Sequence, residues 1–353
     1  MTRFDWRPLV GVFMAILVGL GIGAVLMLIW GYNPWVAYLA LLRGAWGDPY
    51  AIGNTLSRAT PLILTGLTFA IGVRGGLFNI GAQGQMIAGA VAAVAVGGLV
   101  SLPPGWHLLV AAMAAMAAGA LWSLPAAILK LSRGVHEVIS TIMLNLIMQW
   151  FAIYLVVNAL SDPVRGERTV QVATDARFAS LLAGSGLTSA IIAAVAVAVG
   201  LYYVLWHLAS GYELRASGLN PDAARYAGMR PGWSLTLAFL LGGVAAGLAG
   251  ATQVLGRFPY ALTNTLSTVG TLGFDGIAVA LVARNHPLAV IPSALFFGML
   301  NAGGFEMGRE AGVPIDMVQI VQGTIILAVA VPEIWRLGRS ALARGASSWG
   351  AGG

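Results

Sequence analysis

The amino-acid sequence predicts an all-α polytopic membrane protein, and three observations lead to this fold class. Of the 353 residues, 58% are hydrophobic and only 9% are charged, whereas a soluble domain carries about 25% charged residues. Several apolar runs reach the length of about 20 residues that a helix needs to cross a bilayer. The chain has 47 glycines and no cysteine, which favours close helix packing and excludes disulfides and thiolate metal sites.

Long uncharged runs, separated by arginines, aromatic residues and turn formers, predict about ten transmembrane helices in a single domain covering residues 1–353. The first run follows Arg3 and Arg7 and is too long for a signal-peptide core, so we interpret it as a span. The uncharged run 75–129 is too long for one helix, and the turn-forming sequence at 101–105 divides it. The predicted spans are 9–30, 52–73, two within 75–129, 135–158, 188–208, 233–255, 269–284, 287–303 and 314–335.

Aromatic and basic residues predict the orientation of these spans. Between the first two spans lies an aromatic belt, typical of the non-cytoplasmic interface, with Tyr32, Trp35, Trp46 and Tyr50. An even number of spans with the N-terminus inside places both termini in the cytoplasm, together with 12 of the 19 basic residues. This bias agrees with the positive-inside rule. We therefore interpret the net charge of +6 as topology information and not as a nucleic-acid surface.

Spans 2–5 and spans 7–10 form two groups of four that start on opposite sides of the membrane. Inverted-topology groups of this kind are common in transporters. Each group contains a glycine-interrupted segment, at 75–84 in the first and at 270–276 in the second. Broken, glycine-rich segments in corresponding positions of two halves point to a substrate path.

Polar side chains in the first glycine segment are candidates to line such a path. Asn79, Gln83 and Gln85 lie among its glycines at the start of a predicted span. Uncharged amides suit a pathway for a neutral polar solute. The alternative is that they act as polar contacts between packed helices.

Three more candidates lie within predicted spans. Thr141 and Asn145 follow Glu137 at four-residue spacing, so the three share one helix face. We place Glu137 at the cytoplasmic interface and Thr141 and Asn145 on the pathway. Asp275 lies in an otherwise apolar segment, and an intramembrane carboxylate is a functional candidate by default. Two roles stay open for Asp275: it lines the pathway, or it caps a helix over 276–283.

The polar segment 209–232 predicts a short helix with clear boundaries. Asn220 suits the N-cap, Pro221 the first helical position, and Asp222 the positive end of the helix dipole. Gly228 suits the left-handed conformation that ends a helix. The small, smooth face of this helix consists of Ala223, Ala224 and Ala227.

Four motifs carry a resemblance to a known family. Asp-Ala-Ala, three residues and Gly at 222–228 resemble the EAA-xxx-G motif of ABC-importer permeases, with Asp in place of Glu. The other three are GLFNIGAQGQ (76–85), GVHEVISTIMLN (134–145) and GFDGIAVAL (273–281). Over roughly residues 50–335, the chain is similar to the nucleoside and simple-sugar branch of the ribose and branched-chain amino-acid permease superfamily. Members often have Glu where this chain has Gln83, a departure that argues against a required charge.

The resemblance implies a permease subunit of a bacterial ABC importer in the inner (plasma) membrane. It implies three kinds of partner: ATP-binding subunits, a second permease that is a related chain or a second copy, and an extracytoplasmic solute-binding protein. The implied solute is a nucleoside, with a simple sugar as the alternative, and ATP and Mg²⁺ belong to the partner ATPase. The loop 209–232 would be the cytoplasmic ATPase-coupling loop. Its coupling residues would be Asn220, Pro221, Asp222, Ala223, Ala224, Arg225, Ala227 and Gly228.

Absent motifs exclude other classes of protein. Lys130 is the only lysine and lies outside any GxxxxGK[ST] frame, so the chain has no P-loop for ATP. There is no HExxH or GxSxG motif, and the four histidines lack metal-ligand spacing. The rival class is a self-sufficient secondary transporter or channel. It would explain the spans and Asp275 but not the motif at 222–228, and copurification with an ATPase would distinguish the two.

Overall fold

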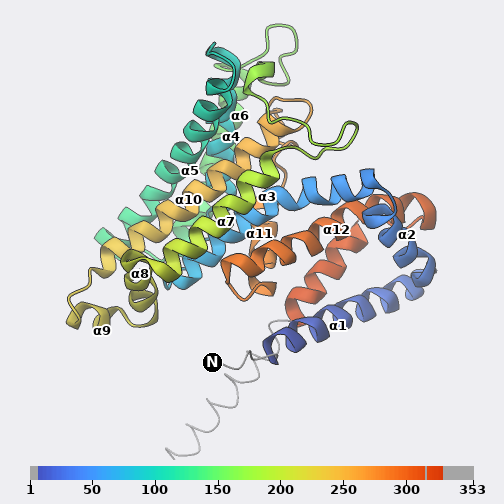
Figure 1. Ribbon diagram of the computed structural model, residues 1–353, viewed down its shortest axis with the longest axis horizontal. Coiled ribbons are helices and arrows are strands. Elements are labelled where there is room, and N and C mark those ends of the chain that lie inside the picture. Colours follow the sequence, from blue (N-terminus) through green and yellow to red (C-terminus); the bar gives the residue numbers. More distant parts are fainter. Residues whose placement is uncertain (1–6, 315, 329–353) are drawn as a thin grey trace, which may run out of the picture. The chain divides into compact units, whose positions relative to one another are not determined.

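The computed structural model describes residues 7–314 and 316–328, and every regular element in this part of the chain is a helix (Figure 1). Among these, eight helices are long and apolar enough to cross a membrane. They are α1 (Arg7–Ile29), α3 (Pro49–Arg74), α4 (Ala82–Leu99), α5 (Trp106–Arg133), α6 (Glu137–Val157), α7 (Ala190–His207), α10 (Pro231–Gly256) and α12 (Pro287–Ala311). The predicted fold class, an all-α polytopic membrane protein, is confirmed.

The remaining described helices are shorter. They are α2 (Pro34–Trp46), the 3₁₀-helix η1 (Thr174–Ala176), α8 (Ala209–Leu219), α9 (Pro221–Tyr226), α11 (Leu272–Val282) and the helix Asp316–Ala328. Each predicted span falls on a helix, but the described parts of the eighth and the tenth are shorter than a full crossing. The exact number of crossings and the inverted grouping therefore stay predictions. Residues 329–335 of the last predicted span lie outside the described residues.

Two α-helices, α2 and α8, are absent from the sequence-based prediction, which has an aromatic belt at the first position and a loop at the second. The backbone N–H of Trp35 donates to the side-chain oxygen of Asn33 at 3.0 Å, and this contact helps α2 to begin directly after α1. At the start of α8, Gly211 packs so closely on α7 that a Cβ atom there would overlap the carbonyl oxygen of Val204. The glycines of this segment thus permit close packing of a helix.

The chain divides into two compact units, one formed by residues 1–44 and 303–353 and the other by residues 45–302. In the described part of the first unit, helix Asp316–Ala328 lies against α1. A Cβ atom on Gly19 would overlap the side chain of Ile325, so the absence of a side chain lets the two helices touch. The regions with functional features described below lie in the second unit.

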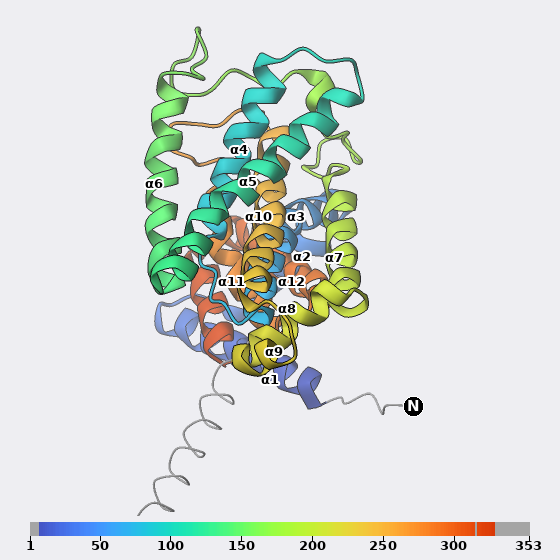
Figure 2. The same ribbon diagram turned by 90° about the vertical axis from the view of Figure 1, so that its left-hand side faces the viewer.

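Helix α10 lies at the centre of the second unit, with α3, α4 and α5 packed around it (Figure 2). Its glycines make this close packing possible. A Cβ atom on Gly243 would overlap the backbone of α5 at Gly119, and one on Gly250 would overlap the backbone of α4 at Met86. Small residues at these contacts let helix backbones approach closely, as in other membrane bundles.

Two non-helical segments interrupt this bundle, 75–81 between α3 and α4 and 257–271 between α10 and α11. The long polar segment between α6 and α7 pairs with the second of them. The backbone N–H of Thr169 donates to the carbonyl oxygen of Leu262 at 2.9 Å, and its hydroxyl accepts from the N–H of Leu262 at 3.0 Å. The segment 257–271 is therefore held against the segment between α6 and α7, and it forms part of the site described next.

Candidate translocation site

The side chain of Gln83 joins the two glycine-rich segments. Its Nε2 donates to the carbonyl oxygen of Gly270 at 2.7 Å, and its Oε1 accepts from the backbone N–H of Gly273 at 2.8 Å. The glycine-interrupted segments 75–84 and 270–276 therefore lie side by side, as expected for a shared path. A carboxylate at position 83 would still accept from Gly273 but would have no proton for Gly270, so the amide suits this contact. The two contacts therefore use both the donor and the acceptor of the Gln83 amide.

Asn145 performs a similar task at the start of α4. Its Oδ1 accepts from the N–H of Gly84 at 2.8 Å, and its Nδ2 donates to the carbonyl oxygen of Ile80 at 2.9 Å. The N-cap position of α4 is Gly81, which has no side chain to accept from the first free N–H groups. Asn145 supplies this acceptor from α6 and fixes the first turn of α4.

Asn79, Gln85 and Thr141 are buried in the same region. The Oδ1 of Asn79 accepts from Gly81 at 2.9 Å, and the hydroxyl of Thr141 donates to the carbonyl oxygen of Glu137 at 2.7 Å. Within the part of the chain that the structure describes, the Nδ2 of Asn79 and the Oε1 of Gln85 are buried without a hydrogen-bond partner, a state that costs about 1–3 kcal/mol per group. Asn79 and Gln85 therefore retain hydrogen-bonding capacity, whereas Thr141 bonds to its own helix.

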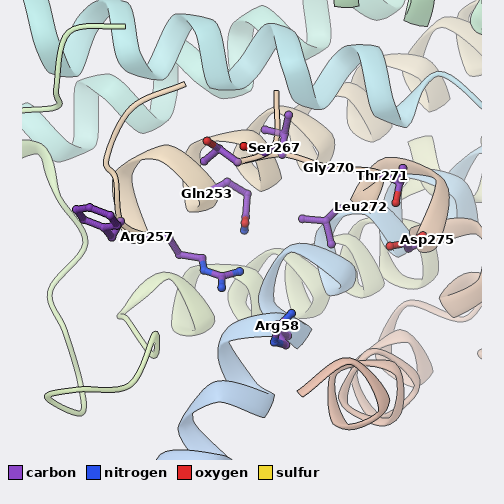
Figure 3. Close-up of a pocket in the computed structure, with 11 residues that line it drawn as sticks. Arg58, Gln253, Arg257, Ser267, Gly270, Thr271, Leu272 and Asp275 are labelled. Carbon is purple, nitrogen blue, oxygen red and sulfur yellow. The ribbon is translucent and has the colours of Figure 1, made fainter. Parts of the chain in front are cut away.

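A cavity of about 320 Å³ opens beside the junction that Gln83 makes. In Figure 3, the guanidinium groups of Arg58 and Arg257 lie on one side, and Asp275 lies beside Thr271 on the other. Gln253 of α10 also lines it. The cavity thus offers donors and a carboxylate to one small polar molecule, and its volume lies at the lower end of the range of ligand pockets.

Burial changes the pKa of Arg257, which lines this cavity. Removal from water lowers the pKa of the Arg257 guanidinium below its ordinary value. A guanidinium stays protonated in proteins even when its pKa falls. Arg257 is therefore a cation with reduced hydration, which strengthens its interaction with any carbonyl or other oxygen that enters.

The capping hypothesis for Asp275 is wrong. Helix α11 begins at Leu272 with Thr271 at the N-cap position, so Asp275 lies inside the first turn. The helix starts earlier than expected because Gln83 holds the backbone at Gly270 and Gly273. The Asp275 side chain bonds to Thr271 and lines the cavity, where the helix dipole favours a negative charge.

The structure brings only one of the six predicted pathway residues, Asp275, to the lining of this cavity. Gln83 lies directly behind it and touches Gly270, which is part of the lining. Asn79, Gln85, Thr141 and Asn145 pack among α3, α4 and α6. A pathway role for these buried residues stays a prediction.

Four residues that line the cavity are not among those predicted from the sequence: Arg58, Gln253, Arg257 and Thr271. Arg58 could have been predicted as a pathway residue from the sequence, because it lies inside the predicted span 52–73. Charged residues within spans mark solute paths. Arg257 follows directly after α10 and resembles an ordinary interfacial arginine in the sequence. Only the folded chain shows that both arginines line the same cavity.

The short helix in 209–232 forms as predicted, as α9. The Oδ1 of Asn220 accepts from the N–H groups of Asp222 at 3.1 Å and Ala223 at 3.0 Å. Pro221 occupies the first helical position, and Gly228 follows the helix with a positive φ of 79°. Asp222 also forms an exposed salt bridge with Arg225 at 3.2 Å.

The prediction that Ala223, Ala224 and Ala227 form one face of this helix is wrong for Ala224. Its exposed fraction is 3%, because α9 packs on α8 and α10 through this residue. Ala223 and Ala227 are exposed, and the neighbouring Tyr226 is 95% exposed. The helix α9 has only six residues, and the side chain of Ala224 packs against the rest of the protein. The opposite side of α9 is exposed.

Comparisons with known proteins show which family model and which relatives the chain matches. Residues 51–330 match the family model described as branched-chain amino acid transport system / permease component. The chain is 41% identical to the guanosine ABC transporter permease protein NupP of Bacillus subtilis, over 90% of this chain and 91% of that protein. It is 34% identical to the nucleoside ABC transporter permease protein NupB of Lactococcus lactis, over 94% and 92%. It is 32% identical to the glucose ABC transporter permease protein TsgB13 of Haloferax volcanii, over 94% and 89%.

Proposed function

The chain belongs to the family of permease components of branched-chain amino acid transport systems, and we propose that it is the nucleoside permease subunit of an ATP-driven importer. As a member of an ABC permease family it is a multi-pass protein of the plasma membrane and a transport subunit, with ATP-binding subunits and a solute-binding protein as partners. Beyond family membership, we propose a nucleoside as the solute, the cavity beside Gln83 as part of its path, and α9 as the element that couples transport to ATP.

The observation that carries the proposal is the cavity of about 320 Å³ beside the Gln83 junction. A nucleoside presents carbonyl and ring-nitrogen acceptors on its base and hydroxyl donors on its ribose. Arg58 and Arg257 supply donors for the base, and the carboxylate of Asp275 accepts from hydroxyl groups. The relatives named for guanosine and nucleosides support this choice of solute.

The proposed pathway has two kinds of residue. Asp275 contacts the solute directly. Asn79 and Gln85 are buried in the described conformation, and their unpaired amide atoms would serve the solute only in a conformation that opens this packing. Gln83 and Asn145 are positioning residues that hold the backbone of the two glycine segments and the start of α4 in place. Thr141 bonds to its own helix, and its pathway role stays a prediction.

Coupling to ATP would take place through α9. In this proposal the loop 209–232 and both termini face the cytoplasm, and α9 docks on an ATPase subunit that binds ATP and Mg²⁺. The exposed alanines Ala223 and Ala227 allow close approach, while Asp222 and Arg225 offer both charges at the contact. A second permease, either a related chain or a second copy, completes the membrane part.

Reconstitution in proteoliposomes tests this function. The complex of permeases, ATPase and solute-binding protein should take up labelled guanosine only when ATP is present on the side of the ATPase. Unlabelled nucleosides should compete with this uptake, and glucose should not. Uptake by the chain without ATPase subunits would instead indicate a self-sufficient transporter or channel.

A simple sugar is the second candidate solute. The glucose permease relative favours it, at 32% identity over 94% of this chain. Arginine and carboxylate side chains also bind sugar hydroxyls, so the cavity fits both chemistries. ATP-dependent uptake of glucose, with no competition by nucleosides, would identify a sugar importer.

A further inference from the structure

A second cavity, of about 260 Å³, lies at the opposite end of α3 from the site described above. It is formed by the last turn of α3, by α8 and by the turn that joins α11 to α12. Three arginines line it, together with Leu219 and Asn285: Arg74, Arg215 and Arg284. The pathway and coupling roles proposed above use none of these side chains.

Two of the guanidinium groups are fixed in position. The Nε of Arg74 donates to the carbonyl oxygen of Asn285 at 2.9 Å, and the Nε of Arg215 donates to the carbonyl oxygen of Leu205 at 3.0 Å. Both groups lie over the ring of Trp206, at 5.5 Å and 5.2 Å from its centroid. Such cation–π contacts orient the cations in advance, so little side-chain entropy would be lost on binding a ligand.

The charge of this cavity is not compensated by carboxylates. None of the salt bridges in the described part of the chain involves Arg74, Arg215 or Arg284, and no acidic side chain lines the cavity. Like charges gathered in one partly enclosed space repel each other. An anion with several oxygen atoms would relieve this repulsion and match the bidentate geometry of guanidinium groups.

The surroundings have the character of a membrane interface. The ring of Trp206 stacks on Tyr202 at 5.4 Å and contacts His286 at 4.9 Å. Aromatic residues of this kind gather at the level of lipid headgroups. Leu219, on the rim, is 89% exposed and offers an apolar surface beside the arginines. Basic pockets between transmembrane helices at this level bind phosphate-bearing headgroups.

We propose that this cavity binds the phosphate of an anionic phospholipid headgroup and thereby braces α8, the helix that leads into the coupling helix α9. Asn220 ends α8 and also caps α9, so the two helices are joined without a flexible linker. Gly218 of α8 packs directly on α3, where a Cβ atom would overlap the carbonyl oxygen of Arg74. The link to coupling rests on the function proposed above, whereas lipid binding itself does not.

Lipid binding to the purified complex tests the proposal. The complex is placed in nanodiscs of phosphatidylcholine, phosphatidylglycerol is added by titration, and the bound lipid is counted by native mass spectrometry. Removing charge with Arg215→Gln and Arg284→Gln should weaken binding about fivefold for each arginine. Arg133→Gln, at the exposed end of α5, is the matched control and should leave binding unchanged. Arg215→Lys with Arg284→Lys keeps the charge but loses the bidentate geometry. It should bind lipid more tightly than the Gln variants and less tightly than the unaltered chain, which separates loss of charge from misfolding.

Three outcomes would overturn the proposal. If inorganic phosphate displaces phosphatidylglycerol at the same concentration in unaltered nanodiscs, the site is one for a free anion. If the Gln variants bind lipid as the control does but lose the ATPase subunit, the arginines hold an acidic partner surface. If neither property changes, the cavity binds no anion. None of these results depends on uptake, so a failure of the nucleoside assay would leave the lipid test intact.

Discussion

Gln83 and Gly273 lie in opposite halves of the sequence, and the side-chain oxygen of the first accepts the backbone N–H of the second at 2.8 Å. The same amide donates to Gly270 at 2.7 Å, so one side chain fixes both ends of the turn that opens α11. This turn carries Asp275 to the cavity. The contact requires a glycine at 273, since a Cβ atom there would overlap the backbone of Gln83.

The first prediction concerns this close approach. Gly273→Ala should sharply reduce the amount of folded protein in the membrane, because backbone atoms cannot move aside as a flexible side chain can. Gly200→Ala is the matched control. Gly200 also lies in a helix but has no neighbouring atom near the position of a Cβ, so the variant should accumulate normally. Equal abundance of the two variants, measured by fluorescence size-exclusion chromatography, would show that α4 and α11 do not pack as described.

The second prediction concerns the amide itself. Gln83→Glu removes the donor to Gly270 and places a carboxylate beside a carbonyl oxygen. Because Gly270 is exposed, losing this one hydrogen bond should destabilise the protein by about 0.5–1.5 kcal/mol. The loss should appear as a lower unfolding temperature in detergent. A variant as stable as the unaltered chain would mean that the Gly270 contact adds nothing.

The third prediction concerns coupling. Ala223→Arg places a long charged side chain on the exposed side of α9, so the protein should fold but ATPase stimulation and uptake should be lost. Ala223→Ser keeps the small size and is the control. Ala224→Arg would bury a charge and should reduce the amount of folded protein instead. Full uptake by folded Ala223→Arg would place the ATPase contact elsewhere.

The fourth prediction concerns orientation. Cysteines introduced at Tyr226 and at Val164 are suitable probes in this cysteine-free chain, because these side chains are 95% and 89% exposed. In intact cells an impermeant maleimide should label the cysteine at 164 and leave the one at 226 unlabelled. The opposite pattern would reverse the proposed topology.

Hydropathy predicts the long helices well, because a span must be apolar over its whole length. It misses α2 and α8, which are short and draw stability from packing and from a side-chain cap. Glycine shows most clearly why a sequence pattern can miss a helix. At Gly211 and Gly218 it resembles a helix breaker in the sequence, yet the structure uses both positions for close contact between helices.

The same limit applies to the site. Asp275 is recognisable from a charge in an apolar segment, but its place in α11 depends on Gln83, which is 192 residues earlier in the numbering. The inward turn of Ala224 depends on how α9 packs on α8 and α10, and no local pattern predicts it. The sequence also does not predict that Arg58 and Arg257 line the same cavity, because they are far apart in the chain.

Uptake of labelled guanosine by proteoliposomes that contain the complete complex, with Asp275→Asn compared to the unaltered chain, tests the central claim most directly. Asparagine keeps the size of the side chain and removes the charge. If Asp275 accepts hydrogen bonds from the solute, uptake should fall about 10- to 100-fold, the loss expected for a hydrogen bond to a charged group. The amount of folded complex and the affinity of the solute-binding protein should stay unchanged. Guanosine uptake by Asp275→Asn at the rate of the unaltered complex would contradict the account, because the solute would then pass without using this carboxylate.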